Sequence, residues 1–382
     1  MNTKSYDVAV IGVGSMGSAA CYYLARAGVS VLGLEQFSIP HEKGSHAGQS
    51  RIIRKAYFEH PDYVPLLQKA YDNWRELENE HNEKLYHDTG LLYMGPENDG
   101  LLEGVRKSAD LYGIEIQDVP DIASKFPKFS TPDNFEAIFE PDAGFVLPEK
   151  TITVLSREAK NLGADIMENT KVHKYELTED GVEVFTSSGN FKAKKIILCS
   201  GAYSNNFNTD SDLSVTQQLI SWVKPKSSFG YELGDFPCWV VSTGKDPGVF
   251  YGFPMLGDNF DGPSGLKLAH HDRGVATTPA EGFTFDDSRE REKLSGFMNE
   301  YMPGAFDQFN EFKSCLYTYS PDDDFIIDFL PEKKNRVILA AGFSGHGFKF
   351  VPVIGEILKD LVVNGKTDLP IEFLSLKRLN DK

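Results

Sequence analysis

Val337-Ile-Leu-Ala-Ala-Gly342-Phe-Ser-Gly345-His346-Gly347-Phe-Lys349 is the stretch that decides the fold. Its apolar run predicts a buried strand, the glycines that follow predict a tight turn, and a helix is expected after Lys349. The chain begins in the same way, because the strand-like Tyr6-Asp-Val-Ala-Val-Ile leads into Gly12-Val-Gly14-Ser15-Met16-Gly17 and then into a helical segment. One strand–glycine–helix unit therefore stands at each end of the 382-residue chain.

The N-terminal unit has the pattern of a dinucleotide site. Its three glycines permit a tight turn, and the helix N-terminus at Ser15 and Met16 is suited to hold a pyrophosphate. A second strand ends at Glu35, which is 23 positions beyond Gly12 and close to where a ribose-binding acid is expected. The alternative is a glycine-rich turn without a ligand, and the motif alone does not separate FAD from NAD.

The second unit bears on the choice of cofactor. A simple nicotinamide dehydrogenase needs only the first unit, whereas two units predict a long cofactor held by both ends of the chain, for which FAD is the natural candidate. The domains must then be discontinuous. We expect an FAD-binding domain of residues 1–85, 147–217 and 320–382. Residues 86–146 and 218–319, which are rich in aromatic residues, Gly and Pro in their second part, are expected to form a strand-built substrate domain.

Composition excludes several classes of protein. The formal net charge of −17 argues against nonspecific nucleic-acid binding. No apolar run approaches the ~20 residues of a membrane span, and no secretory leader pattern is present, so we expect a soluble cytoplasmic protein. The four cysteines show no metal-ligand spacing, and we expect no metal. Cys21, Cys199 and Cys238 are interpreted as small core residues.

Two arginines stand in the segment Gly44-Ser45-His46-Ala47-Gly48-Gln49-Ser50-Arg51-Ile-Ile-Arg54. In a helical turn this spacing would bring both guanidinium groups near one face, where they could grip a carboxylate. Two solvated surface arginines are the alternative. That alternative is weakened by the flanking apolar residues and by the nearness of the segment to the cofactor unit.

Four further features have both a functional and a structural interpretation. Lys267 and Lys349 lie among apolar residues or glycines. As fixed cations they could stabilise negative charge forming on dioxygen. The alternative is that both are solvated surface lysines. Cys315 is a strand-core cysteine from its spacing alone, although a nearby cation would make its thiol a nucleophile. Ser200-Gly201 ends a strand and could close over a cofactor, or it is an ordinary strand exit.

Together these motifs resemble the monomeric sarcosine oxidase family, which includes N-methyltryptophan and pipecolate oxidases, over essentially the whole chain. The resemblance rests on the Gly12–Gly17 motif, Gly48-Gln-Ser-Arg51-Ile-Ile-Arg54, Tyr251-Gly-Phe-Pro254, Gly265-Leu-Lys267 with His271, Cys315-x-Tyr317-Thr318 and Gly342–Lys349. It implies an α/β fold, in which a Rossmann-like FAD domain of the two-dinucleotide type joins a substrate domain built on a mixed, largely antiparallel sheet plus helices.

The resemblance also implies roles for single residues. FAD is expected to be joined covalently to Cys315. The residues implied to contact the cofactor are Gly12, Gly14, Ser15, Met16, Gly17, Glu35, Ser50, Arg51, Val172, Ser200, Gly201, Gly342, Gly345, His346, Gly347 and Lys349. Arg54 and Lys349 match the pair that binds the substrate carboxylate, and Tyr251, His271 and Tyr317 match residues lining the substrate pocket. Lys267 matches the lysine that activates dioxygen; Lys267, Arg51, His46 and Tyr317 form the expected catalytic group.

One position departs from the family pattern. The family usually has Gly-Ser-x-His-Gly, and Ala47 stands where the histidine beside the flavin would be, one place after His46. The expected activity is the oxidation of a secondary amino acid to an imine, with hydrogen peroxide as the second product, by a monomer whose partners are an amino-acid substrate and dioxygen. The alternatives are a dehydrogenase that passes electrons to a carrier protein and an inactive flavin-binding homologue.

Overall fold

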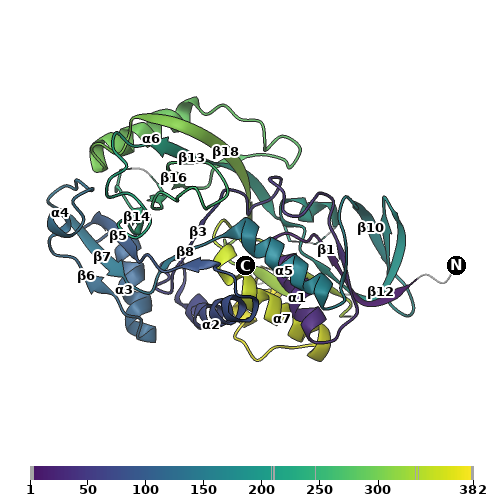
Figure 1. Ribbon diagram of the computed structural model, residues 1–382. Coiled ribbons are helices and arrows are strands. Elements are labelled where there is room, and N and C mark those ends of the chain that lie inside the picture. Colours follow the sequence, from purple (N-terminus) through teal and green to yellow (C-terminus); the bar gives the residue numbers. More distant parts are fainter. Residues whose placement is uncertain are drawn as a thin grey trace.

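The computed structural model describes residues 4–207, 209, 211–245, 247–331, 333 and 335–379. Its first sheet has eight strands, most of them parallel, and contains both chain-terminal units (Figure 1). Along the main path the strands are β10 (Val172–Leu177), β11 (Val182–Thr186), β12 (Gly189–Leu198), β1 (Ser5–Ile11), β2 (Val31–Leu34) and β9 (Asp165–Met167). β20 (Val337–Ala341) pairs with β12, and β19 (Ile326–Phe329) pairs with β20.

Helices cover one face of this sheet because its central strands are apolar on both faces. The strands β1 and β20 are almost wholly buried. Of the covering helices, α1 (Ser15–Arg26) packs against both α5 (Pro148–Asn161) and α7 (Val351–Asn364), with α2 (Val64–His81) beside α7. The carboxyl ends of β1 and β20 therefore open toward the same edge, where the two glycine turns begin.

The second sheet has nine strands and is antiparallel except for one parallel pair, β5 with β14. Its strands are β5 (Leu91–Pro96), β6 (Gln117–Asp118), β7 (Phe135–Glu140), β13 (Ser214–Lys224), β14 (Cys238–Val241), β15 (Val249–Gly252), β16 (Leu266–His271), β17 (Val275–Ala276) and β18 (Gln308–Tyr319). Helix α6 (Ser288–Tyr301) covers one face, where Phe297 stacks on Phe250 and Trp239 with ring centroids 4.2 and 5.5 Å apart. The helices α3 (Gly100–Tyr112) and α4 (Ile122–Lys125) flank the other end.

A third, small sheet lies between the two large ones (Figure 1). It contains β3 (Arg51–Ile53), β8 (Gly144–Val146) and β4 (Tyr86–His87). The expected helical turn at Arg51–Arg54 is therefore wrong: β3 pairs with β8 from Arg51 to Ile53. The two β-branched isoleucines favour the extended conformation, and in a strand residues three apart point to opposite faces.

Five short 3-10 helices complete the described chain: η1 (Pro61–Tyr63), η2 (Gly201–Phe207), η3 (Phe348–Phe350), η4 (Glu372–Leu374) and η5 (Leu376–Leu379). No helix within the described ranges is long and apolar enough to span a membrane. The division of the chain into two discontinuous domains stays a prediction, and residues 1–3 and 380–382 of the expected FAD domain lie outside the described residues. β13 belongs to the second sheet and begins at Ser214, four positions before the expected start of the substrate domain.

Candidate active site

The turn between β1 and α1 leaves the helix N-terminus open to a ligand. Gly12 has a φ of +90°, and a Cβ there would lie 2.6 Å from the carbonyl oxygen of Cys199, so that only glycine fits. At Gly14, the N-cap of α1, a Cβ would meet nothing nearer than the ring of His46 at 3.7 Å. No side chain caps α1 at this residue, and the backbone N–H groups of its first turn are available to an anion.

Glu35 lies beside this turn at the end of β2. Its carboxylate accepts hydrogen bonds from the backbone N–H groups of Val13 at 2.8 Å and Phe37 at 3.0 Å, and the side chain is buried. The ring of His41 approaches it, with Nε2 3.5 Å from Oε1. Glu35, which was predicted from its separation from Gly12 in the sequence, is therefore held in a fixed position. It lines the same cavity as Gly12.

That cavity runs from the dinucleotide turn to the second sheet and encloses about 1760 Å³, its solvent-open part included. Most of the predicted site residues line it: Gly12, Gly14, Ser15, Met16, Glu35, His46, Arg51, Arg54, Val172, Ser200, Gly201, Tyr251, His271, Tyr317, Gly342, Gly345, His346, Gly347 and Lys349. Four predicted residues do not line it: Gly17, Ser50, Lys267 and Cys315. Both glycine turns thus border one space, as a cofactor held by both ends of the chain requires.

The residues present fit FAD. The open N-terminus of α1 would hold its pyrophosphate, Glu35 its ribose, and the turns at Ser200–Gly201 and Gly342–Gly347 the rest of the molecule. His46 is buried beside Gly14, and its Nε2 has no hydrogen-bond partner within the described chain, as expected of a group that faces a missing ligand. Burial and the neighbouring His41 lower the pKa of His46 to about 4, which keeps its imidazole neutral.

At the far end of the cavity Arg54 is already paired with a carboxylate. Its Nη2 lies 2.5 Å from each oxygen of Glu59, and its Nη1 donates to the carbonyl of Ala56 at 3.1 Å. The guanidinium also lies over the rings of Tyr57 and Phe58, 4.4 and 4.0 Å from their centroids. Burial opposes the charge on Arg54, but Glu59, Tyr93 and Tyr57 together raise its pKa. Burial likewise raises the pKa of Glu59, but Arg54, His346 and Lys349 together lower it to about 2.

Lys349 supplies a second cation at the same end. Its Nζ donates to the carbonyl of His346 at 2.7 Å and lies 5.2 Å from the centroid of the Tyr57 ring. Burial, together with the charge of Arg54, lowers the pKa of Lys349 to about 7. The backbone at Lys349 is held by the indole N–H of Trp74, which donates to the Lys349 carbonyl at 2.9 Å.

Three aromatic side chains from the second sheet form the opposite wall. Tyr251 comes from β15, His271 from β16 and Tyr317 from β18, and the His271 ring lies 6.4 and 5.6 Å from the two tyrosine rings. Burial raises the pKa of Tyr251 to about 12 and lowers that of His271 to about 4. All three side chains are therefore neutral at neutral pH, and they can hydrogen-bond a substrate without adding charge.

Arg51 and Lys267 form a separate basic group, held by backbone oxygens. Burial and the charge of Arg51 lower the pKa of Lys267 well below its usual value. Arg51 donates to the carbonyls of Ser50, Ser45 and Ala47 at 2.8, 3.0 and 2.7 Å. Lys267 is buried behind Ser50, with Nζ 2.5 Å from its carbonyl oxygen and 3.2 Å from its Oγ. Neither residue is a solvated lysine or arginine at the surface, and Arg51 and Arg54 bind different partners within the described chain.

Cys315 lies on β18 between these cations and Tyr317 and is buried. Burial raises the pKa of its thiol, while Arg51 and Lys267 act in the opposite direction without overcoming it. Basic side chains are thus present beside Cys315, but in the described chain they do not make it a thiolate at neutral pH.

Sequence reasoning missed two carboxylates of the site. Glu59 follows Arg54 by five positions, a spacing with no periodic meaning, so nothing in the sequence indicated the pair. Glu149 accepts the backbone N–H groups of Gly48 and Gln49 at 2.7 and 3.1 Å and so fixes the loop that contains His46 and Ala47. Its only signal is its place in the first turn of helix α5, where acids are common.

Comparison with known proteins identifies the family of the chain. Residues 7–361 match the family model described as FAD dependent oxidoreductase. Monomeric sarcosine oxidase from Bacillus sp. (strain NS-129) is 36% identical over 382 residues, which cover 98% of this chain and 97% of the relative. N-methyl-L-tryptophan oxidase from Yersinia pestis (strain Pestoides F) is 33% identical over 377 residues, 98% and 99% of the two chains. Among solved structures, NikD, an unusual amino acid oxidase essential for nikkomycin biosynthesis, matches with a TM-score of 0.85 and 26% identity over 98% of both chains.

Proposed function

The chain belongs to the FAD dependent oxidoreductase family, and from this premise we propose that it is an oxidase of secondary amino acids. The expected substrates are N-methyl or cyclic amino acids, and the expected products are an imine and hydrogen peroxide. When bound, FAD supplies the two-electron oxidation of the substrate's C–N bond and the transfer of those electrons to dioxygen.

One observation carries the substrate class. Two buried cations, Arg54 and Lys349, lie together at the end of the cavity opposite the dinucleotide turn. Buried cations are costly unless they meet an anion, and a substrate carboxylate is an anion that fits this place. A carboxylate bound there brings the amine of the same molecule toward the wall formed by Tyr251, His271 and Tyr317.

Glu59 sets the condition for binding. Because it occupies Nη2 of Arg54 at 2.5 Å, a substrate carboxylate must take its place or share the guanidinium with it. The neutral state of His271 and the two tyrosines favours a neutral amine, which needs no general base before it is oxidised.

The remaining roles follow from charge and position. Arg51 and Lys267 lie near Cys315, and we assign to Lys267, in its protonated form, the stabilisation of negative charge that appears when dioxygen is reduced. We also propose a thioether between the Cys315 sulfur and the 8α-carbon of FAD. It would replace one S–H and one C–H bond, and the two electrons and two protons lost would pass to dioxygen. The protein is proposed to act as a monomer, with the two discontinuous domains given above.

A peroxide-release screen tests the proposal. The purified flavoprotein is supplied under air with sarcosine, pipecolate, N-methyltryptophan and proline, and hydrogen peroxide is measured with a peroxidase-coupled dye. We expect at least one to yield peroxide in proportion to amine consumed. Substrate-dependent bleaching of the flavin without peroxide would indicate a dehydrogenase, and no bleaching with any of the four would contradict the proposed substrate class.

A further inference from the structure

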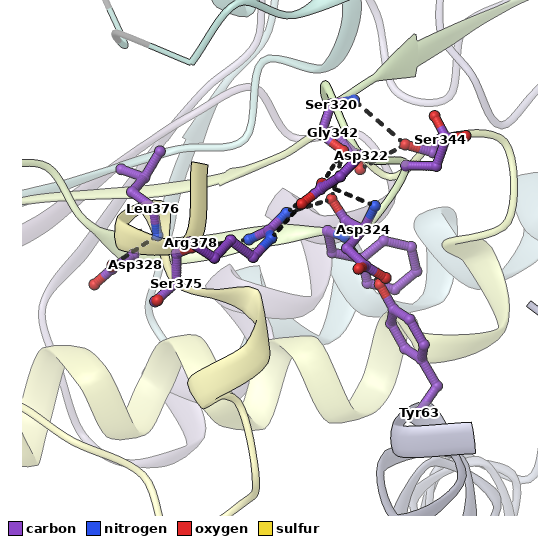
Figure 2. A network of polar contacts seen from close by, with 12 residues as sticks. Tyr63, Ser320, Asp322, Asp324, Asp328, Gly342, Ser344, Ser375, Leu376 and Arg378 are labelled. Carbon is purple, nitrogen blue, oxygen red and sulfur yellow. Dashed lines mark hydrogen bonds and ion pairs between the residues drawn. The ribbon is translucent and has the colours of Figure 1, made fainter. Parts of the chain in front are cut away.

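The last described turn of the chain is joined to the segment between β18 and β19. Arg378 in η5 meets Asp322 through two parallel contacts, with Nε 3.0 Å from Oδ2 and Nη2 3.0 Å from Oδ1. Both side chains are largely buried, at 16% and 11% exposure. Figure 2 shows the guanidinium pointing into this segment, residues 320–325, which we name the β18–β19 loop. A bidentate, mostly desolvated pair of this kind fixes orientation as well as distance.

The same guanidinium closes the β18–β19 loop on itself. Nη2 of Arg378 also donates to the carbonyl of Asp324 at 2.8 Å, and the Ser320 hydroxyl donates to that carbonyl at 2.6 Å. The next backbone N–H, of Phe325, donates to the Tyr63 hydroxyl at 2.9 Å. Asp323, at the tip, has a φ of +69°, a conformation that a residue other than glycine keeps only when its surroundings impose it.

The β18–β19 loop supports the cofactor-side turn Gly342–Gly347 at two points. The backbone N–H of Ser320 lies 3.4 Å from the Ser344 hydroxyl, which in turn donates to the carbonyl of Gly342 at 3.0 Å (Figure 2). Further along, His346 Nε2 lies 3.3 Å from the carbonyl oxygen of Asp323. The turn therefore rests on the loop that Arg378 holds.

The second point of support decides where His346 carries its proton. A carbonyl oxygen only accepts hydrogen bonds, so the contact with Asp323 requires the proton on Nε2. Nδ1 is then free to accept the hydrogen bond from the Tyr57 hydroxyl, with which it is in contact. The Tyr57 ring lies beneath both cations of the substrate end, Arg54 and Lys349.

We propose that Arg378 is a positioning residue of the active site: through Asp322 it holds the β18–β19 loop, and thereby the Gly342–Gly347 turn and the hydrogen-bond direction of His346. The last turn of the chain thus acts on the substrate end of the cavity without touching it. The identity of the ligand that the Gly342–Gly347 turn faces rests on the proposed function. The hydrogen-bonded connection from Arg378 to that turn does not.

Hydrogen–deuterium exchange on the flavin-loaded protein tests the connection. Arg378→Gln should accelerate exchange of the amides in 320–325 and 342–348 by about tenfold or more, because the loop opens once its charge-assisted contacts are lost. Lys377→Gln removes the same charge from the exposed neighbour on the same turn and should leave both segments unchanged. Acceleration confined to 371–379 in Arg378→Gln would overturn the proposal.

A second variant keeps the test decisive if Arg378→Gln does not accumulate in folded form. Asp322→Asn removes the other half of the pair and should accelerate the same two segments. The double variant should exchange no faster than the faster single one, since each removes the same interaction. Additive acceleration would show that the two residues act independently and would overturn the proposal.

Ligand binding then separates a positioning role from a merely structural one. The affinity for acetate, measured by calorimetry, should fall severalfold in Arg378→Gln and Asp322→Asn and stay at the wild-type value in Lys377→Gln. Equal affinity in all variants would overturn the effect on the substrate end. If no amine proves to be a substrate, the proposed function fails, while the exchange and binding results still decide this inference.

Discussion

Replacing Glu59 with glutamine should make the protein bind carboxylates more tightly. Glu59 holds Nη2 of Arg54 through both oxygens at 2.5 Å, and a bound carboxylate must displace it. The substitution keeps the shape of the side chain and removes its charge. Arg54 should keep its position, because the Ala56 carbonyl and the rings of Tyr57 and Phe58 still hold the guanidinium.

The size of the effect follows from the contact that is lost. Hydrogen bonds to charged groups contribute about 1.5–3 kcal/mol, and the pair is largely buried, with the side chains 4% and 23% exposed. At ~1.4 kcal/mol per factor of ten, removing this competitor should lower the dissociation constant of acetate by about ten- to a hundredfold.

Calorimetric titration of the flavin-loaded protein measures this without turnover. Acetamide, which has the same size and no charge, should bind equally to wild type and Glu59→Gln. Asp62→Asn removes a negative charge from the exposed surface of the same segment and should leave acetate binding unchanged. Unchanged or weaker acetate binding in Glu59→Gln would refute the reasoning, since Glu59 would then organise Arg54 rather than compete for it.

Three other outcomes are expected. Acid-denatured wild-type protein should stay yellow and Cys315→Ala should release its flavin; complete loss of flavin from the wild type would contradict the covalent link. Lys267→Met should slow reoxidation by air by about a hundredfold while anaerobic reduction by substrate changes far less, which stopped-flow absorbance measures in one preparation; a wild-type rate of reoxidation would make Lys267 merely structural. Burial and Arg54 place the pKa of Lys349 at about 7, so this amine loses its charge as pH rises through 7. Acetate should therefore bind up to about tenfold more weakly per pH unit above that value. Lys349→Met should abolish this pH dependence, and a dependence that persists would assign it to another group.

The sequence predicted the cofactor framework because that framework is local. Each glycine unit is a strand, a turn and a helix within a few residues, and the distance from Gly12 to Glu35 is set by one such unit. The membership of the FAD dependent oxidoreductase family and the α/β fold with a second, mostly antiparallel sheet are confirmed. The residue roles and the domain boundaries stay predictions.

The sequence could not predict the pairing of charges. Arg54 meets Glu59 because the chain bends at Ala56, and no periodic pattern in the sequence encodes that bend. The spacing of Arg51 and Arg54 was interpreted as a helical turn, whereas Arg51–Ile53 form strand β3. Whether the Cys315 thiol is activated depends on burial by strands far away in sequence, which outweighs the effect of Arg51 and Lys267 on the thiol pKa. Such balances between burial and charge are set by packing and do not appear in a linear pattern.

The order of strands in the first sheet has a consequence for how the protein is made. β12 lies between β1 and β20, so residues from the beginning, middle and end of the chain must meet before its centre is complete. A ribosome releases the chain from the N-terminus, and contacts between distant segments form late. The edge of β12 that receives β20 therefore stays open until residues 337–341 have been synthesised, and flavin can be captured between both turns only after the Gly342–Gly347 turn has left the ribosome.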